Sequence, residues 1–326
     1  MILSIKNDNI SLEPITQVCG TNIKRKNAII NNIVKYFSGS KYAEYDEMQA
    51  YDIRVDDKVV GRKYFNVYRI KSKEDLVCGI EISKTSLMKK YLDYINTQYD
   101  NQIVYENIVN EYMKIFKHIN DEMEKADINL HMDFLEEKIN DICQIAVTKS
   151  NDYDYIENMS NIELYKEYMH VLKAFYIDNP EKILLILENV DHMLDRNEYK
   201  ELIQELDCLT NELDINIIST MSIDGYVVIN DYCSTGINII NDENYVLPEL
   251  ADMEKFFYNN YPCTYNLNRE NMILWLEKIV NYIGCELYTP IDREYVFLKL
   301  LNESIGMHFE RYNMKNNLEN AFMQTV

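Results

Sequence analysis

The sequence has little that would mark a secreted, membrane-spanning or metal-dependent protein. Its clearest aliphatic run, Ile183–Leu187, is far shorter than the roughly 20 apolar residues that a helix needs to cross a bilayer. Residues 1–10 lack the basic-then-apolar pattern of a signal peptide. The seven cysteines are scattered singly without a CxxC pair, and the five histidines have no metal-ligand spacing. These absences predict a cytoplasmic protein with reduced thiols, no membrane segment and no recognisable metal centre.

The sequence also has few basic residues relative to acidic ones, and its net charge is −21. At first sight this argues against binding of nucleic acid. The distribution is uneven, however. Residues 1–90 hold 16 Lys or Arg and 11 Asp or Glu, whereas the remainder holds 17 and 43. A basic first quarter can bind DNA if folding gathers its cations on one surface. An ordinary acidic protein would give the same counts, so charge alone leaves both interpretations open.

Strand and helix patterns alternate in the first and third quarters of the chain. Short apolar runs predict strands, and a spacing of three and four apolar residues predicts helices. Strands are predicted at residues 2–5, 15–19, 59–60, 65–70, 76–82, 182–187, 215–219, 225–229 and 236–240, and helices at residues 25–37 and 195–213. Asp195 is a suitable N-cap for the second helix. Strands that alternate with helices predict a mostly parallel sheet, and hence an α/β fold.

Residues 84–178 contain no glycine or proline, and their apolar residues recur at helical spacing. This pattern predicts helices around 87–95, 108–119, 135–145 and 164–175. The predicted organisation is a discontinuous α/β domain over 1–83 and 179–262, a helical insertion over 84–178, and a helical C-terminal extension over 263–326.

A segment between the second strand and the first helix resembles the P-loop pattern G-x-x-x-x-G-K-[ST], whose backbone amides cradle phosphate. Gly20 and Lys26 fit this pattern, whereas Arg25 replaces the second glycine. Asn27 replaces the hydroxyl residue that would bind magnesium. Alone, this match is weak.

A second segment strengthens the P-loop interpretation. Residues 179–195 follow the ABC-type ATPase pattern NP-x-hhhhDEP-x-x-x-LD, with Glu188 in the place of the magnesium-binding acid. Asn189 replaces the glutamate that activates water, and an amide cannot act as a base. Met221 replaces the switch histidine, and no Ser-Gly-Gly signature is present near residues 162–166. The sequence therefore predicts a degenerate P-loop, ABC-ATPase-like sheet domain that does not hydrolyse ATP.

A basic, inactive frame of this kind, with a helical insertion and an acidic total, resembles the CRISPR-associated Csn2 family. These are spacer-acquisition ring proteins of bacterial subtype II-A systems. The segments that carry the resemblance are residues 20–37, 182–187, 195–220 and 226–241, and the tail after residue 262 resembles the extension of the family's long form.

The resemblance implies a homotetrameric ring that binds the ends of double-stranded DNA in its channel, without sequence preference. It also implies two protein partners, the spacer integrase and the RNA-guided nuclease of the same locus. Short family members carry calcium ions that stabilise the ring. Ca²⁺ is therefore a candidate structural ion, although no calcium ligands can be matched in this sequence.

Basic residues of the first quarter are the candidate DNA contacts, because Lys and Arg bind phosphates and release counterions. The candidates are Lys24, Arg25, Lys26, Lys58, Arg62, Lys63, Arg69, Lys71 and Lys73. No base-reading motif is visible, which favours binding by shape and charge. Two other functions stay open, an atypical ABC-type ATPase of DNA repair and an acidic scaffold for protein partners.

Overall fold

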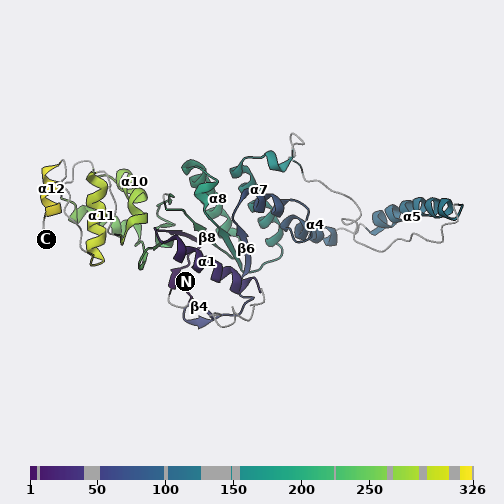
Figure 1. Ribbon diagram of the computed structural model, residues 1–326, viewed down its shortest axis with the longest axis horizontal. Coiled ribbons are helices and arrows are strands. Elements are labelled where there is room, and N and C mark those ends of the chain that lie inside the picture. Colours follow the sequence, from purple (N-terminus) through teal and green to yellow (C-terminus); the bar gives the residue numbers. More distant parts are fainter. Residues whose placement is uncertain are drawn as a thin grey trace.

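The computed structural model describes residues 1–5, 8–39, 52–98, 102–125, 148, 155–223, 225–262, 267–285, 292–307 and 316–324. The predicted helix at 135–145 lies outside these ranges. Figure 1 shows two sheets at the centre, a group of C-terminal helices at one end, and helix α5 at the other end. None of the described helices combines the length and apolarity needed to span a membrane.

The main sheet has six strands in the order β10-β9-β3-β8-β7-β6. Its strands are β3 (Ile15–Cys19), β6 (Asn66–Ile70), β7 (Ile183–Leu187), β8 (Ile215–Thr220), β9 (Ile237–Ile240) and β10 (Asn244–Val246). All neighbours pair in parallel except β10, which is antiparallel to β9. Every residue of β3 and β7 is buried, as expected of parallel strands that are covered on both faces. The predicted mixed α/β fold is therefore confirmed.

A second, four-stranded antiparallel sheet has the order β2-β1-β4-β5. Its strands are β1 (Ile2–Ile5), β2 (Asp8–Ser11), β4 (Ile53–Val55) and β5 (Lys58–Val59). Helix α1 (Ile23–Phe37) packs between the two sheets, because Ile29, Ile30 and Ile33 share one buried cluster with residues of both. Only one face of α1 is left exposed.

Helices α3 (Lys73–Ile80), α4 (Leu87–Gln98), α7 (Asn161–Tyr176) and α8 (Arg196–Glu212) pack together on the opposite face of the main sheet. Asp195 caps α8 as predicted, with its side chain accepting from the N–H groups of Asn197 and Glu198. The prediction of a strand at 76–82 is wrong, because Leu76, Val77 and Ile80 lie on the buried face of α3. Helix α7 belongs to the core of the main sheet, although it falls within the predicted insertion.

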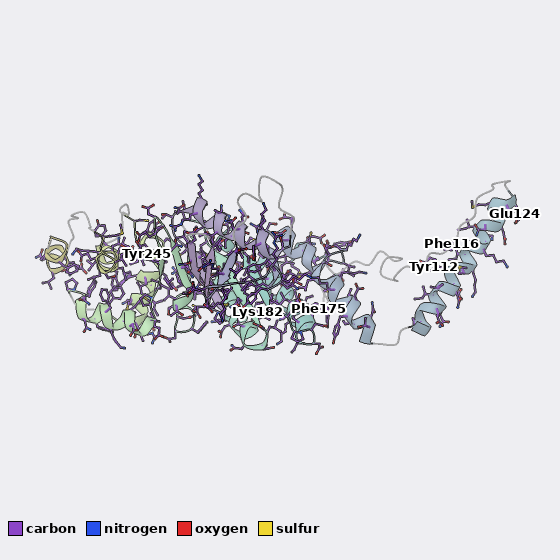
Figure 2. The ribbon with its side chains drawn as sticks, turned by 90° about the horizontal axis from the view of Figure 1, so that it is seen from below. Tyr112, Phe116, Glu124, Phe175, Lys182 and Tyr245 are labelled. Carbon is purple, nitrogen blue, oxygen red and sulfur yellow. The ribbon has the colours of Figure 1, made fainter. Side chains whose placement is uncertain are left out.

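Helix α5 (Gln102–Lys125) stands apart from the sheets. Figure 2 shows its residues Tyr112, Phe116 and Glu124 far from Phe175 and Lys182 at the centre of the molecule. Helix α9 (Leu250–Asn260) precedes the predicted extension over 263–326, and the extension itself forms α10 (Arg269–Ile279), α11 (Asp292–Ser304) and α12 (Asn317–Gln324). Elsewhere, 3-10 turns lie at Ile156–Asn158, Val190–His192, Ser234–Gly236 and Val280–Tyr282. The predicted helical character of the tail is thus confirmed.

Residues 225–230 form no strand, so the predicted strand at 225–229 is wrong. The antiparallel pair at this end of the sheet is formed by β9 and β10 instead. Tyr245 of β10 lies at the side of the sheet that faces the C-terminal helices (Figure 2). A side chain at Gly284 would lie 2.4 Å from the Tyr245 ring, so the sheet and the tail are in tight contact.

Candidate functional site

The turn between β3 and α1 is much shorter than a phosphate-binding loop requires. Only Gly20, Thr21 and Asn22 separate the end of β3 from the start of α1 at Ile23. Asn22 caps the helix, since its Oδ1 accepts from the Arg25 N–H at 3.1 Å. Helix α1 therefore begins three residues before Lys26. In the P-loop pattern, the stretch before the lysine is a glycine-rich loop whose amides face the phosphates.

The backbone amides of this turn are occupied by two asparagine side chains. The Gly20 N–H donates to Asn281 Oδ1 at 3.2 Å, and the Thr21 N–H donates to Asn241 Oδ1 at 2.6 Å. Both asparagines are buried, with exposed fractions of 3% and 1%. Gly20 has a φ of +101°, and a Cβ on it would lie 2.5 Å from the Ile240 carbonyl oxygen. The donors that a phosphate would need already have partners within the chain.

Lys26 points into the protein. Its side chain is 3% exposed, and its Nζ donates to the Met221 carbonyl at 2.7 Å. Burial lowers the pKa of this ammonium, while Cys19 and Asp191 act in the opposite direction. The predicted DNA contact of Lys26 stays a prediction, and the burial of its ammonium against the Met221 carbonyl speaks against it.

The two positions after β7 are also engaged within the protein. Glu188 forms an ion pair with Arg69, which in turn donates to Asn31 Oδ1 at 2.6 Å. Asn189 adopts a left-handed conformation with a φ of +49°, and its N–H donates to Thr220 Oγ1 at 3.0 Å. Gly20 thus follows the end of β3, Glu188 and Asn189 follow the end of β7, and Lys26 reaches the residue after β8. All four lie at the carboxyl edge of the sheet, where ligands of α/β proteins bind.

Asn27 does not join this group, because it is exposed on the outer face of α1. Since Lys26 and Asn27 are neighbours on a helix, their side chains point about 100° apart. The magnesium position of the P-loop pattern therefore faces solvent, while the lysine position faces the core.

The remaining basic candidates fall into two groups. Five of them are exposed: Lys24, Lys58, Arg62, Lys63 and Lys71. The other three are held by the protein: Arg25 forms an ion pair with Asp8 at 2.6 Å, Arg69 pairs with Glu188, and Lys73 Nζ donates to the Met159 carbonyl at 2.8 Å. These five side chains lie at the surface, and the Arg62 guanidinium also lies 6.0 Å from the centre of the Tyr36 ring.

Asn241 and Asn281 are residues that sequence reasoning missed. They lie 220 and 261 positions from their partners in the β3–α1 turn, so no local pattern could link them. Within the described parts of the chain, no group of three His, Cys, Asp or Glu side chains is arranged to hold a metal ion. Calcium binding therefore stays a prediction.

Comparisons with known proteins place the chain in a class. Residues 5–317 match the family model of the CRISPR-associated protein Csn2, subfamily St, so the chain belongs to the Csn2 family and is CRISPR-associated. The resemblance drawn from the sequence is thereby confirmed.

One solved structure is similar over nearly the whole length of both proteins. It is described as the crystal structure of Stu0660 of Streptococcus thermophilus, and it matches with a TM-score of 0.82 at 20% identity over 99% of each chain. At this identity the likeness shows a shared fold. No curated protein sequence matches the chain.

Proposed function

We propose that this Csn2-family protein binds double-stranded DNA without sequence preference and thereby serves spacer acquisition. The observation that carries the proposal is the group of five exposed cations, all of them within the first 71 residues of a chain whose net charge is −21. Contacts from such cations to phosphates release counterions, which drives binding to any sequence. The acidic remainder of the surface repels DNA and confines binding to the basic part.

The proposed role is non-enzymatic. The β3–α1 turn is interpreted as the remnant of a P-loop whose phosphate donors now hold Asn241 and Asn281. Asn189, in the place of the catalytic glutamate, supplies no base. The Lys26 ammonium, which would contact the nucleotide phosphates in a working P-loop, donates to the Met221 carbonyl instead. These substitutions support a protein with an ATPase-like sheet that does not hydrolyse ATP.

Family membership supports the wider setting of the proposal. We infer a homotetrameric ring in the cytoplasm that holds DNA ends in its channel. We further infer that it works with the spacer integrase and the RNA-guided nuclease of the same locus. Structural Ca²⁺ remains part of this proposal and can be tested by the effect of a chelator on the native mass.

A gel-shift assay with linear and closed circular duplexes tests the DNA proposal across a range of salt. Linear DNA should bind at low salt, and binding should weaken steeply as salt rises. The double variant Lys58→Ala/Lys63→Ala should lower the slope of log K against log[salt] by about 2, since each phosphate contact contributes about 0.9. The control Lys114→Ala/Lys255→Ala removes two exposed charges from α5 and α9 and should leave the slope unchanged.

The outcomes separate the three functions. Lack of binding to linear DNA at low salt would reject the proposal and leave the scaffold for protein partners. Phosphate release from ATP that disappears in Lys26→Ala would favour the ATPase. A preference for linear over closed circular DNA would support the threading of ends through a ring.

A further inference from the structure

The exposed face of α1 differs in charge from every other α-helix that the structure describes, because α1 alone has no Asp or Glu. The outward positions recur at helical spacing, and they carry cations, amides and a small residue. They are the exposed residues Lys24, Asn27, Ala28, Asn31 and Asn32, followed by the half-buried Lys35. In a chain with a net charge of −21, such a helix itself contributes no negative charge that would repel a polyanion.

One amide on this face is held in a fixed orientation. Asn31 Oδ1 accepts a hydrogen bond from the Arg69 guanidinium at 2.6 Å. Because the oxygen is occupied, the Nδ2 group is left as the donor that Asn31 presents at the surface. The helix therefore offers amide donors between Lys24 and Lys35, and donors are what phosphate oxygens require.

The dimensions of the face suit a nucleic-acid backbone. Lys24 and Lys35 are eleven residues apart, which is about 16 Å along a helix. This length is several times the axial rise of about 3.4 Å per B-DNA nucleotide, so the two lysines can reach different phosphates of one duplex. At the end of α1, the Arg62 guanidinium lies 6.0 Å from the centre of the Tyr36 ring and extends the positive surface.

The packing of α1 decides how DNA can be contacted. Ile29, Ile30 and Ile33 are buried between the two sheets, so α1 cannot enter a major groove as a free recognition helix does. Only its outer face is available, and this face can follow a backbone without reaching base edges. A helix held in this way binds without reading sequence.

We propose that the outer face of α1 is the surface that follows the phosphate backbone of duplex DNA, with Lys24 and Lys35 neutralising phosphates and Asn27 and Asn31 donating hydrogen bonds to them. This inference rests on the proposed DNA function. It assigns a role to Asn27 and Asn31 that charge counting misses, because neither side chain is ionised.

Salt-dependent anisotropy with a labelled linear duplex tests the inference in the full-length protein. The double variant Lys24→Ala/Lys35→Ala should lower the slope of log K against log[salt] by about 1.8. The double variant Asn27→Ala/Asn31→Ala should bind about tenfold more weakly at every salt concentration, with an unchanged slope, because uncharged donors release no counterions.

A control and a folding check accompany these variants. Gln204→Ala/Asn211→Ala removes two exposed amides from α8 and should change neither affinity nor slope. Alanine has a higher helix propensity than asparagine, but Asn31→Ala also removes the acceptor of the Arg69 guanidinium. Because these two effects oppose each other, the melting temperature of the α1 amide variant should stay within about 2 °C of the wild type. A weaker affinity in that variant then reports a lost contact and not a lost fold.

Two results overturn the inference in distinguishable ways. If the wild type binds with a steep salt slope and both α1 variants match it within twofold, DNA lies elsewhere and the proposed function stands without this surface. If the wild type does not bind duplex DNA at low salt, the proposed function fails and the inference fails with it.

Discussion

Asn241 joins the β3–α1 turn to the C-terminal tail, and its removal gives a sharp test of this arrangement. Its Oδ1 accepts from the Thr21 N–H at 2.6 Å and from the Thr21 hydroxyl at 2.9 Å. Its Nδ2 donates to the carbonyls of Asn281, at 3.1 Å, and Ile283. The side chain is 1% exposed, so water cannot replace it without a rearrangement. Asn241→Ala thus leaves three backbone groups without their present partner.

The expected decrease in the free energy of unfolding follows from the cost of leaving buried polar groups unsatisfied, about 1–3 kcal/mol each. Because Thr21 is partly exposed, we take the low end and expect a total of about 3 kcal/mol. For a chain of this size, the corresponding fall in Tm is about 6 °C. Differential scanning calorimetry measures it directly. Asn211→Ala, on the exposed face of α8, is the control and should stay within about 0.5 kcal/mol of the wild type.

Asn241→Asp refines the test. A carboxylate keeps the acceptor for Thr21 but faces the carbonyls of Asn281 and Ile283 without a proton to donate. It should therefore destabilise the protein at least as much as alanine does at neutral pH. A fall in Tm of less than about 2 °C in Asn241→Ala would refute the claim that the tail is clamped by this side chain.

Two further predictions concern the same edge of the sheet and the buried thiols. Gly20→Ala should lower the free energy of unfolding, measured by thermal denaturation, by more than about 2 kcal/mol. The reason is that its φ is +101° and the new Cβ would lie 2.5 Å from the Ile240 carbonyl oxygen. Gly61→Ala, which meets open space, should be neutral or slightly stabilising. Burial raises the pKa of both Cys19 and Cys233 to about 12, from 9.0. These thiols bind protons more tightly in the folded than in the unfolded protein. Their contribution to the free energy of unfolding is therefore complete below about pH 9 and is lost as pH rises towards about 12. A melting series at alkaline pH should show this fall, and Cys19→Ala should reduce its steepness.

Local patterns were sufficient for a strand that is buried along its whole length and for a helix with a clear N-cap. The aliphatic run of β7 predicts a strand because parallel strands are covered on both faces, and the capping residue Asp195 marks the start of α8. The segment of α3 misled the prediction. The helix has only eight residues, and Leu76 and Ile80 are four positions apart, a spacing that fits both the helical period and the alternation of a strand.

Most of the second sheet was beyond local reasoning. Strand β2 is polar and four residues long, and β4 pairs with β1 across about fifty residues of chain. Such strands become stable only when distant partners supply their hydrogen bonds. The sequence therefore carried little signal for the sheet that encloses α1 and leaves a single face of this helix exposed.

The sequence by itself determined the order of the main strands and helices, the family, and the concentration of cations in the first quarter. These depend on composition and on spacing over a few residues. Only the tertiary structure decided that Lys26 turns inward to the Met221 carbonyl, and that Asn241 and Asn281 fill the amides of the β3–α1 turn. Those contacts join residues about 200 or more positions apart, so burial and partner choice were fixed by packing, which no local pattern records.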